Sequence, residues 1–351
     1  MLNKAIPPLS LVLMSALLPP ALATNNEEIP SNEDAATQQI VRMIEESVRA
    51  EAAKNGLARR DAHTKAHGCV QAEFRVLDNL PEEVRVGIFG EARAYPAWIR
   101  YSNGSGKLQD DSVGDGRGMA IKLMGIERSE SGTQDFVMIN HPVFFVRNAA
   151  DYVEFQKAIS EDNSVKFFFP GLNPFNFRLH EFIIANAIRG KKVTNPLNIR
   201  YWSMTPYRFG DTAMKFSARP CGASSPFIET SSPNFLRENM QQHLAQSEAC
   251  FDFLVQLRKL PTEMPIENPT IEWSEKDSPF IPVARITIPV QAFTTPEQLK
   301  FCENLSFTPW HAIPEHQPLG GINRVRKTVY GTISRVRHEL NDDKRYEPTG
   351  F

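Results

Sequence analysis

The order of hydrophobic and polar residues along the chain first indicates a series of short strands. Runs rich in apolar and β-branched residues are separated by clusters of Pro, Gly, Asn and Asp. These runs predict strands at residues 70–76, 84–89, 97–101, 118–123, 136–146, 201–219 and 280–293. Because hairpin-sized gaps separate many of them, we expect an antiparallel sheet or barrel.

Other stretches show apolar residues at helical spacing. Residues 34–55 carry Ile40, Met43, Ile44 and Val48, with Gly56 as a stop signal, and predict a helical arm laid against the main body. Further helices are expected at residues 178–189 and 235–260. The fold class is therefore α+β, with inserted and C-terminal helices added to one barrel domain.

The last helical stretch, residues 323–340, brings a tyrosine close to its apolar face. That face holds Val325, Val329, Ile333, Val336 and Leu340. Arg326, Tyr330 and Arg337 form a narrow stripe beside it, and Asn323 is expected to cap the helix start. A tyrosine with an arginine one turn before it suits an ionised phenol that binds haem iron as an axial ligand. An ordinary amphipathic helix with a hydrogen-bonded tyrosine explains the same pattern.

The N-terminus has the pattern of an export signal. Lys4 precedes a short apolar run at residues 9–18, and residues 21–23 form a small-residue cleavage site. We therefore expect a signal peptide at residues 1–23, a leader and helical arm at 24–56, and one domain at 57–351. The protein is expected to be periplasmic or secreted, and no segment is long and apolar enough to span a membrane.

Composition narrows the possible partners. The chain has 351 residues and a formal net charge of −2, which gives no support for nucleic acid as a partner. In an oxidising compartment the four cysteines, Cys69, Cys221, Cys250 and Cys302, can form up to two disulfides. Their spacing does not determine the pairing, and free buried thiols are an equal alternative.

Several separated motifs give a more specific indication. They are Arg60-Asp-Ala-His63-Thr-Lys65, Trp98-Ile-Arg100-Tyr-Ser102-Asn with Gly114-Asp-Gly-Arg117-Gly, and Asn140-His-Pro-Val-Phe144-Phe145-Val-Arg147. Together with Arg326 to Tyr330, these motifs resemble the haem catalase family. The similarity runs in order from about Arg60 to His338 and includes residues 276–283 and 307–309. The resemblance implies a catalase-like antiparallel β-barrel.

The resemblance also implies a set of residues on the distal face of a haem. His63 is similar to the distal acid–base histidine, and Ser102 to the hydroxyl that orients its imidazole. Asn140 is similar to the distal amide, and Phe145 to the phenyl ring that lies against the porphyrin. A neutral imidazole near the iron can move a proton between the two oxygens of a peroxide as their bond breaks.

A second set of residues is implied for cofactor binding. Tyr330 resembles the proximal iron ligand and Arg326 its charge partner, while Arg60, Arg100 and Arg337 resemble the partners of the haem propionates. We expect heme b, with its iron, to be bound non-covalently, because the chain has no Cys-x-x-Cys-His attachment motif.

Some of these assignments have alternatives. His67 lies four residues after His63 and could be the distal base, although the spacing from Arg60 favours His63. The two histidines could instead bind a metal, but no nearby Cys or carboxylate completes such a site. We expect Arg117 to be structural.

The departures from the family suggest a minimal enzyme. The chain ends 21 residues after Tyr330, so the large C-terminal helical region is lacking, and Ser217 replaces a histidine associated with NADPH. We expect a catalase-related peroxidase that reduces hydrogen peroxide and organic peroxides through a ferryl intermediate, with weak catalase activity.

Its partners would be the peroxide and a small-molecule electron donor, and we expect a monomer or homodimer. Two alternatives are a fatty-acid hydroperoxide isomerase (allene oxide synthase-like) and a non-enzymatic haem-binding protein. The isomerases that resemble this chain carry a threonine before the distal histidine, where this chain has Ala62.

Overall fold

The computed structural model describes residues 27–222, 231–345 and 347–351. The predicted signal peptide at residues 1–23 lies outside the described residues. The strands are β1 Ala66–Val76, β2 Ala94–Asn103, β3 Arg117–Met124, β4 Thr133–Ile139, β5 Tyr201–Trp202, β6 Tyr207–Phe209, β7 Thr212–Pro220, β8 Ala249–Leu257 and β9 Ile281–Ile288. The helices are α1 Glu33–Asn55, α2 Ala149–Ser160, α3 Val165–Phe168, α4 Leu179–Arg189, α5 Phe235–Leu244, α6 Pro296–Asn304 and α7 Gly321–Leu340. None of the described helices is long and apolar enough to cross a membrane.

Eight of the strands close into an antiparallel barrel. The ring runs β1-β2-β3-β4-β5-β7-β8-β9 and returns to β1, with β6 paired to β7 as a hairpin outside the ring. The short strand β5 completes the closure, because Trp202 pairs with Ile139 of β4 and with Ser217 of β7. The expectation of an α+β barrel with inserted and C-terminal helices is confirmed.

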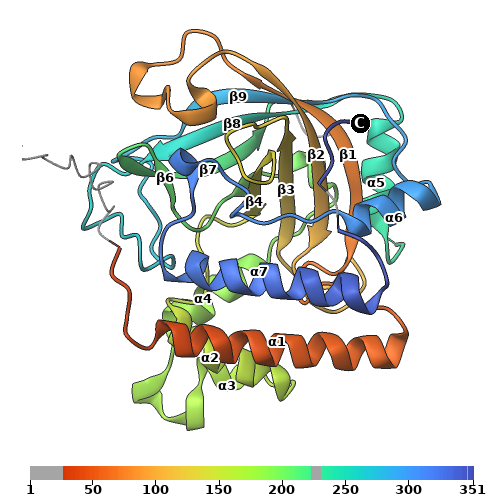
Figure 1. Ribbon diagram of the computed structural model, residues 1–351. Helices are drawn as coiled ribbons and strands as arrows, with labels where there is room; N and C mark the ends of the chain where they lie inside the picture. Colours follow the sequence, from red (N-terminus) through yellow and green to blue (C-terminus); the bar gives the residue numbers. More distant parts are fainter. Residues whose placement is uncertain (1–26, 223–230, 346) are drawn as a thin grey trace, which may run out of the picture.

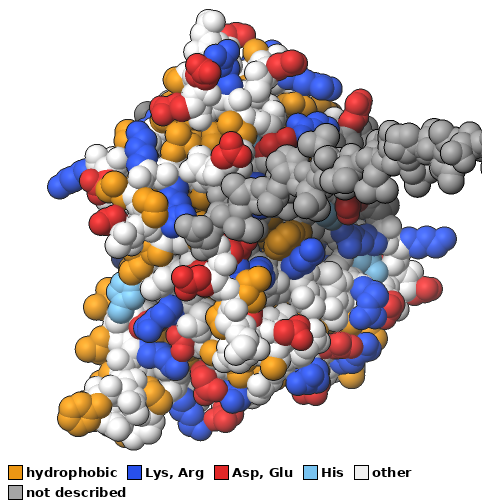
Figure 2. Space-filling view, turned by 60° about the vertical axis from the view of Figure 1, so that its left-hand side comes forward, with side chains coloured by type: hydrophobic (Ala, Val, Ile, Leu, Met, Phe, Trp, Pro, Cys, Tyr) orange, Lys and Arg blue, Asp and Glu red, His pale blue; other side chains and the backbone are white. Residues whose placement is uncertain are grey.

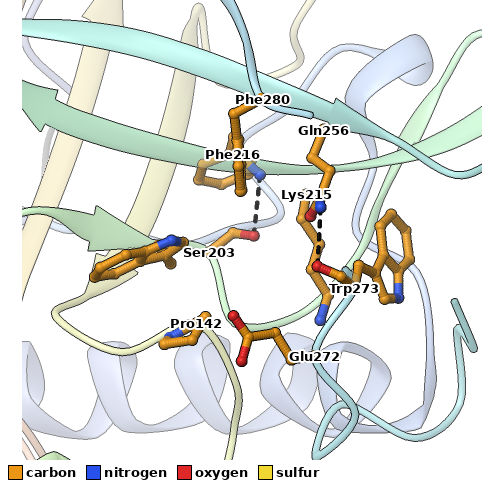
Figure 3. Close-up of a pocket in the computed structure, with 9 residues that line it drawn as sticks. Pro142, Ser203, Lys215, Phe216, Gln256, Glu272, Trp273 and Phe280 are labelled. Atoms are coloured by element: carbon orange, nitrogen blue, oxygen red, sulfur yellow. Dashed lines mark hydrogen bonds between the residues drawn. The ribbon is translucent and has the colours of Figure 1, made fainter. Parts of the chain in front are cut away.

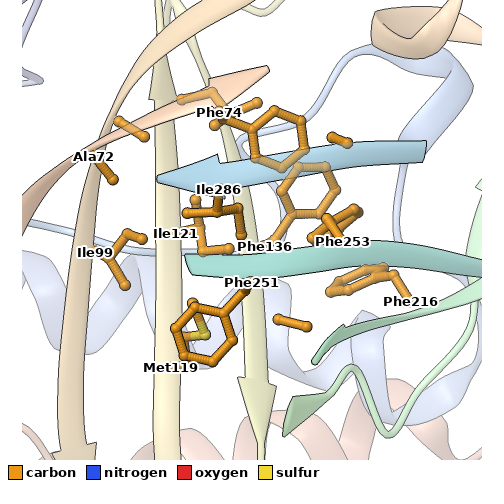
Figure 4. Packing of buried hydrophobic residues seen from close by; sticks show 14 of the residues in the cluster. Ala72, Phe74, Ile99, Met119, Ile121, Phe136, Phe216, Phe251, Phe253 and Ile286 are labelled. Atoms are coloured by element: carbon orange, nitrogen blue, oxygen red, sulfur yellow. The ribbon is translucent and has the colours of Figure 1, made fainter. Parts of the chain in front are cut away.

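Phenylalanine side chains fill the inside of the barrel. Phe74, Phe136, Phe216, Phe251 and Phe253 are at most 1% exposed and belong to one cluster (Figure 4). The rings of Phe136 and Phe253 lie 4.7 Å apart between centroids, within the range of favourable aromatic contact. Part of the high phenylalanine content therefore lies in the barrel core, and burial of these rings stabilises the closed barrel.

The helices α1 and α7 lie side by side across one end of the barrel strands (Figure 1). The predicted apolar face of α7 packs against α1: Val325, Val329 and Ile333 share a buried cluster with Ile40 and Ile44. The opposite side of α7 faces the barrel. Because α1 covers the apolar face, the polar stripe of α7 points toward the barrel wall.

Large apolar side chains remain exposed on the segment that includes α3 and the start of α4. Phe175 is 94% exposed and Leu172 is 78% exposed. Figure 2 shows hydrophobic side chains on the outside of the molecule, including its lower end.

Two predicted elements differ in type. Residues 84–89 do not form a strand. They include the end of one 3-10 turn, Glu82–Val84, and the whole of a second, Gly87–Phe89, where Gly87 has a positive φ of 59° that interrupts an extended run. The helix predicted at residues 235–260 ends at Leu244, and residues 249–257 form β8. Pairing of β8 with β7 on one side and with β9 on the other makes this segment a strand, whatever the helical spacing before it.

Three smaller predictions are also wrong: the end of one strand, the residue that caps α7, and the burial of the last residue of its apolar face. The strand expected at residues 136–146 ends at Ile139, before Pro142. Gly320 stands at the N-cap position of α7, so Asn323 is the third residue of the helix and does not cap it. Leu340 is 42% exposed at the end of the helix, beyond the packed part of the apolar face.

Candidate active site

A large cavity lies between the barrel wall and α7. Residues of the loop before β1, of β2 to β4 and of α7 line it together. The lining includes the predicted site residues Arg60, His63, Arg100, Ser102, Arg326, Tyr330 and Arg337. Residues from opposite ends of the sequence therefore meet in one hollow. The sequence-based assignment placed these seven residues around one cofactor.

His63 is held in a defined orientation at the barrel side of the cavity. Its Nδ1 lies 3.0 Å from Oγ of Ser102, and its carbonyl oxygen accepts a hydrogen bond of 2.7 Å from Arg100 Nη2. A side chain at Gly118 would place its Cβ 2.5 Å from Nδ1 of His63, so only glycine leaves room for the ring. The bond at Nδ1 leaves Nε2 as the nitrogen available for acid–base chemistry.

The imidazole of His63 is held in its neutral form. Burial lowers the pKa of His63 to about 4, and the positive charges of Arg100 and Arg326 act in the same direction. At neutral pH the ring can therefore accept a proton from a bound molecule. The backbone of His63 has a positive φ of 56°, an uncommon conformation that its own contacts with Arg100 and Gly104 maintain.

His67 does not line the cavity. Its Nε2 lies 3.0 Å from Oδ1 of Asn103, and Nδ2 of Asn103 donates to Asp111. Arg117 belongs to the same buried group, donating to the carbonyl oxygen of Asp111 at 2.8 Å. The geometry thus favours His63 over His67 as the acid–base residue and gives Arg117 a structural role.

We expect His67 to make the protein less stable in acid. Burial lowers the pKa of His67 to about 3, so the unfolded chain takes up a proton near pH 6.5 that the folded chain refuses until about pH 3. The unfolding free energy should therefore fall as pH decreases through this window, by up to about 1.4 kcal/mol per pH unit from this residue. Urea unfolding of the wild type and of His67→Gln at several pH values between 7 and 4 measures the difference.

The variant should show the gentler slope, whatever its stability at pH 7. His180→Gln, which changes a surface histidine of α4, is the matched control and should keep the wild-type slope. Equal slopes for the wild type and His67→Gln would contradict the prediction.

Tyr330 faces the cavity from α7, one turn after Arg326. Arg326 Nη2 donates a hydrogen bond of 3.2 Å to the Tyr330 hydroxyl oxygen. Burial alone would lower the pKa of Arg326, but the oxygens of Tyr330 and Tyr207 raise it above its usual range. Asn323 Oδ1 accepts a further bond of 3.0 Å from Arg326 Nη1, so the guanidinium is fixed in position. The Arg326 guanidinium thus holds a positive charge beside the Tyr330 oxygen, an atom of the kind that can bind a metal.

Three guanidinium groups meet at one edge of the cavity around a single carboxylate. Glu303 Oε1 forms an ion pair with Arg60 Nη1 at 2.8 Å and accepts a hydrogen bond of 2.8 Å from Arg337 Nη2. Arg100 completes the group, and burial together with the charge of Arg60 lowers its pKa well below the ordinary value. The three positive charges exceed the negative charge of Glu303 by two, and Arg59 and Asp61 add one charged group of each sign, so the edge keeps an excess of two positive charges.

Two predicted distal residues lie outside the cavity lining. Asn140 is buried, and its Oδ1 accepts a hydrogen bond of 2.8 Å from the backbone N–H of Arg117. Its Nδ2 has no hydrogen-bond partner within the described ranges. Phe145 packs on Phe155, with ring centroids 4.8 Å apart, and the neighbouring Phe144 lines the cavity. The distal roles of Asn140 and Phe145 therefore stay predictions.

Other cavity residues were missed by the sequence reasoning. Asp61 and Tyr152 line the cavity. Burial raises the pKa of both side chains above their ordinary values. Glu303 was missed as well. In the sequence, Asp61 stands out only by its position between Arg60 and His63, and a carboxylate at that position could equally well lie on the surface.

A second hollow lies away from this site, beside β7 and β8. Its open volume is about 10 Å³, against about 190 Å³ for the large cavity. Figure 3 shows Lys215, Glu272 and Trp273 around it, with Ser203 bonded to the backbone N–H of Phe216. A space of this size holds roughly one water molecule. It is therefore too small for a cofactor.

The large cavity fits a haem by the chemistry of its lining. The Nε atoms of Arg100 and Arg337 are buried and lack hydrogen-bond partners among the described residues. Together with the excess of two positive charges, they suit a ligand that carries two carboxylates. Tyr330 on α7 supplies an oxygen ligand of the kind that binds haem iron, and His63 supplies a base from the barrel side.

Comparisons with known proteins show similarity to catalases, both in part of the sequence and in the fold. A model of the catalase family, described as Catalase, matches residues 25–180. Catalase-A from Dictyostelium discoideum is 25% identical over 252 residues, which are 64% of this chain and 48% of that protein. The chain thus spans about half the length of this curated relative.

Solved structures show the same architecture. Catalase A from Saccharomyces cerevisiae superimposes with a TM-score of 0.64 at 19% identity, over 86% of this chain and 67% of that one. A bacterial catalase superimposes with a TM-score of 0.64 at 15% identity, over 93% of this chain and 66% of that one. The similarity to these structures establishes a catalase-like fold.

Proposed function

We propose that the chain is a member of the catalase family and works as a haem-dependent peroxidase that reduces hydrogen peroxide and organic peroxides and has weak catalase activity; the family match at residues 25–180 and the catalase-like fold support this. One observation carries the proposal. His63 with Ser102 and Tyr330 with Arg326 line the same cavity, the first pair from the barrel and the second from α7. Family homology by itself supports the coarser statement that the protein acts on peroxide.

The cofactor of this proposal is heme b, which members of the family bind. Arg60, Arg100 and Arg337 would hold its two carboxylates, and Tyr330 would bind its iron. Haem, when bound, supplies the iron that exchanges electrons with the peroxide. The excess of two positive charges among the three arginines and Glu303 supports this assignment.

His63 performs the proton transfer in this proposal. Its Nε2 takes the proton from one peroxide oxygen and returns it to the other as the O–O bond breaks. The low pKa of His63, about 4, keeps the ring ready to accept that proton at neutral pH. The contact between Ser102 and Nδ1 fixes the orientation of the His63 ring, so Nε2 is already in position before the reaction begins.

We infer a short route from the surface to His63, which would favour peroxidase activity over dioxygen release. Ala62, next to His63, lines the cavity and is exposed, which supports an entrance close to the acid–base residue. An open entrance admits organic peroxides and electron donors, which a long narrow channel would exclude by size. It also gives a second hydrogen peroxide molecule no advantage over other reductants.

We therefore expect a haem-loaded sample to oxidise a dye readily with hydrogen peroxide or an alkyl hydroperoxide, and to release dioxygen slowly. Parallel assays of dye oxidation and dioxygen release on one sample measure the ratio. Fast dioxygen release without dye oxidation would make the protein a true catalase. Rearrangement of a fatty-acid hydroperoxide without consumption of a donor would identify a hydroperoxide isomerase instead.

Export of the protein is a separate part of the proposal. The structure forms two disulfides, Cys69–Cys302 and Cys221–Cys250, and bonds of this kind persist in oxidising compartments. We expect cleavage near Ala23 and a mature chain that begins near Thr24. Mass spectrometry of the periplasmic or secreted form should show this N-terminus. A mature chain that retains Lys4 would contradict export by this signal.

A further inference from the structure

The helix α6 carries the carboxylate that organises the arginine group. Besides its side chain, the backbone carbonyl of Glu303 accepts from Arg60 Nη2 at 3.0 Å and from Arg337 Nη2 at 3.1 Å. The carbonyl of Leu305, just after the helix, accepts from Arg60 Nη2 at 2.6 Å. The C-terminal end of α6 thus determines where two of the three guanidinium groups lie.

Few side chains of α6 pack against the barrel. It has nine residues, and Cys302 is its only fully buried residue. The capping box between Thr295 and Gln298 stabilises the helix itself and does not attach it to the barrel. Phe301 packs on Trp98 of β2, with ring centroids 4.7 Å apart and ring planes tilted by 55°. A short, exposed helix of this kind would open locally at small cost in free energy.

A disulfide attaches this helix to the barrel. Cys302 is bonded to Cys69 of β1, with the two Cα atoms 5.4 Å apart. Cys69 follows His63 by six residues, and Cys302 immediately precedes Glu303. One covalent bond therefore joins the strand that follows the acid–base residue to the residue that organises the arginines.

We propose that the Cys69–Cys302 disulfide is a positioning element of the haem site, which keeps Glu303 between Arg60 and Arg337 so that both guanidiniums stay in place for the haem carboxylates. The proposal rests on the haem-binding function proposed above. The arginines require such a partner, because three like charges repel one another in a partly buried space. Arg60, Arg100 and Arg337 keep Glu303 ionised, lowering its pKa against the effect of burial. Loss of the tether frees α6 to move and lets the guanidiniums separate.

The test is the rate at which haem leaves the protein. Wild type and the double variant Cys69→Ser/Cys302→Ser are loaded with heme b, and transfer of haem to an excess of a tight haem-binding acceptor is followed by absorbance. We expect the variant to lose haem about 10–100-fold faster, the range found when groups that orient metal-site ligands are removed. The measurement is made well below the unfolding temperature of both proteins.

The second disulfide provides a matched control. Cys221→Ser/Cys250→Ser removes a disulfide between the end of β7 and β8, away from the arginines, and should keep the wild-type rate of haem loss. Glu303→Ala with the disulfide intact should accelerate haem loss, and Glu303→Gln, which keeps an acceptor oxygen, should accelerate it less. Equal rates for the two cysteine double variants would overturn the proposal. A wild type that binds no haem would instead overturn the proposed function, so the two failures are distinguishable.

Discussion

His63→Ala is expected to slow the reaction of the haem-loaded protein with hydrogen peroxide by about 10²–10⁴-fold, the usual cost of losing a positioned acid–base group. His63 lies in the cavity with Nδ1 bonded to Ser102, and burial keeps its pKa at about 4. Alanine removes both the proton acceptor and its orientation. Stopped-flow measurement of the peroxide-dependent absorbance change gives the rate constant.

His67→Gln is the control for this experiment. His67 is buried in the group with Asn103 and Asp111 and does not line the cavity, so its loss should leave the rate within a few-fold of wild type. The opposite pattern, a slow His67 variant and a fast His63→Ala, would reassign the acid–base role.

Tyr330→Phe is expected to abolish or grossly alter the haem spectrum while most of the fold remains. The change removes one oxygen, the hydroxyl that accepts from Arg326 Nη2, from a helix whose apolar face packs independently on α1. Without that oxygen, Tyr330 would offer no ligand atom to the haem iron. Far-ultraviolet circular dichroism checks the fold, and the visible spectrum reports the ligand.

Tyr152→Phe separates the ligand role from a general effect of losing a hydroxyl in the cavity. Tyr152 lines the same cavity from α2, and its ring packs beside Phe155 and Phe144. This variant should retain the wild-type haem spectrum. An unchanged spectrum in Tyr330→Phe would remove Tyr330 as the iron ligand.

The sequence predicted the barrel because most of its strands are separated by short gaps. It misassigned residues 84–89, where a single glycine of positive φ turns an apolar run into 3-10 turns. It also extended α5 through β8, since apolar residues at helical spacing continue into a strand whose partners lie far away in the chain. Whether such a segment forms a helix or a strand depends on its pairing with distant segments, which the local order of residues does not reveal.

For the site too, the sequence predicted the direction of side chains on a regular helix better than that of side chains in irregular segments. Tyr330, Arg326 and Arg337 share one stripe of a regular helix, so their common direction toward the cavity follows from the period of α7. Asn140 and Phe145 follow the end of β4, where no regular period determines the direction of a side chain. Phe144 lines the cavity there instead.

Long-range contacts of charged groups were equally hidden from the sequence. Glu303 lies 243 positions from Arg60 along the chain, and only the folded structure brings them together. The same holds for the cysteines, whose pairing was left open and is Cys69–Cys302 and Cys221–Cys250.

The most direct test of a haem held between Tyr330 and His63 is a titration of the purified full chain with heme b, followed by visible absorbance and then by addition of hydrogen peroxide. We expect one haem per chain, a ferric spectrum that saturates at that ratio, and an immediate spectral change with peroxide that a reducing dye reverses. A protein that binds no haem in stoichiometric amount, or whose bound haem leaves peroxide unreacted, would contradict the proposed function.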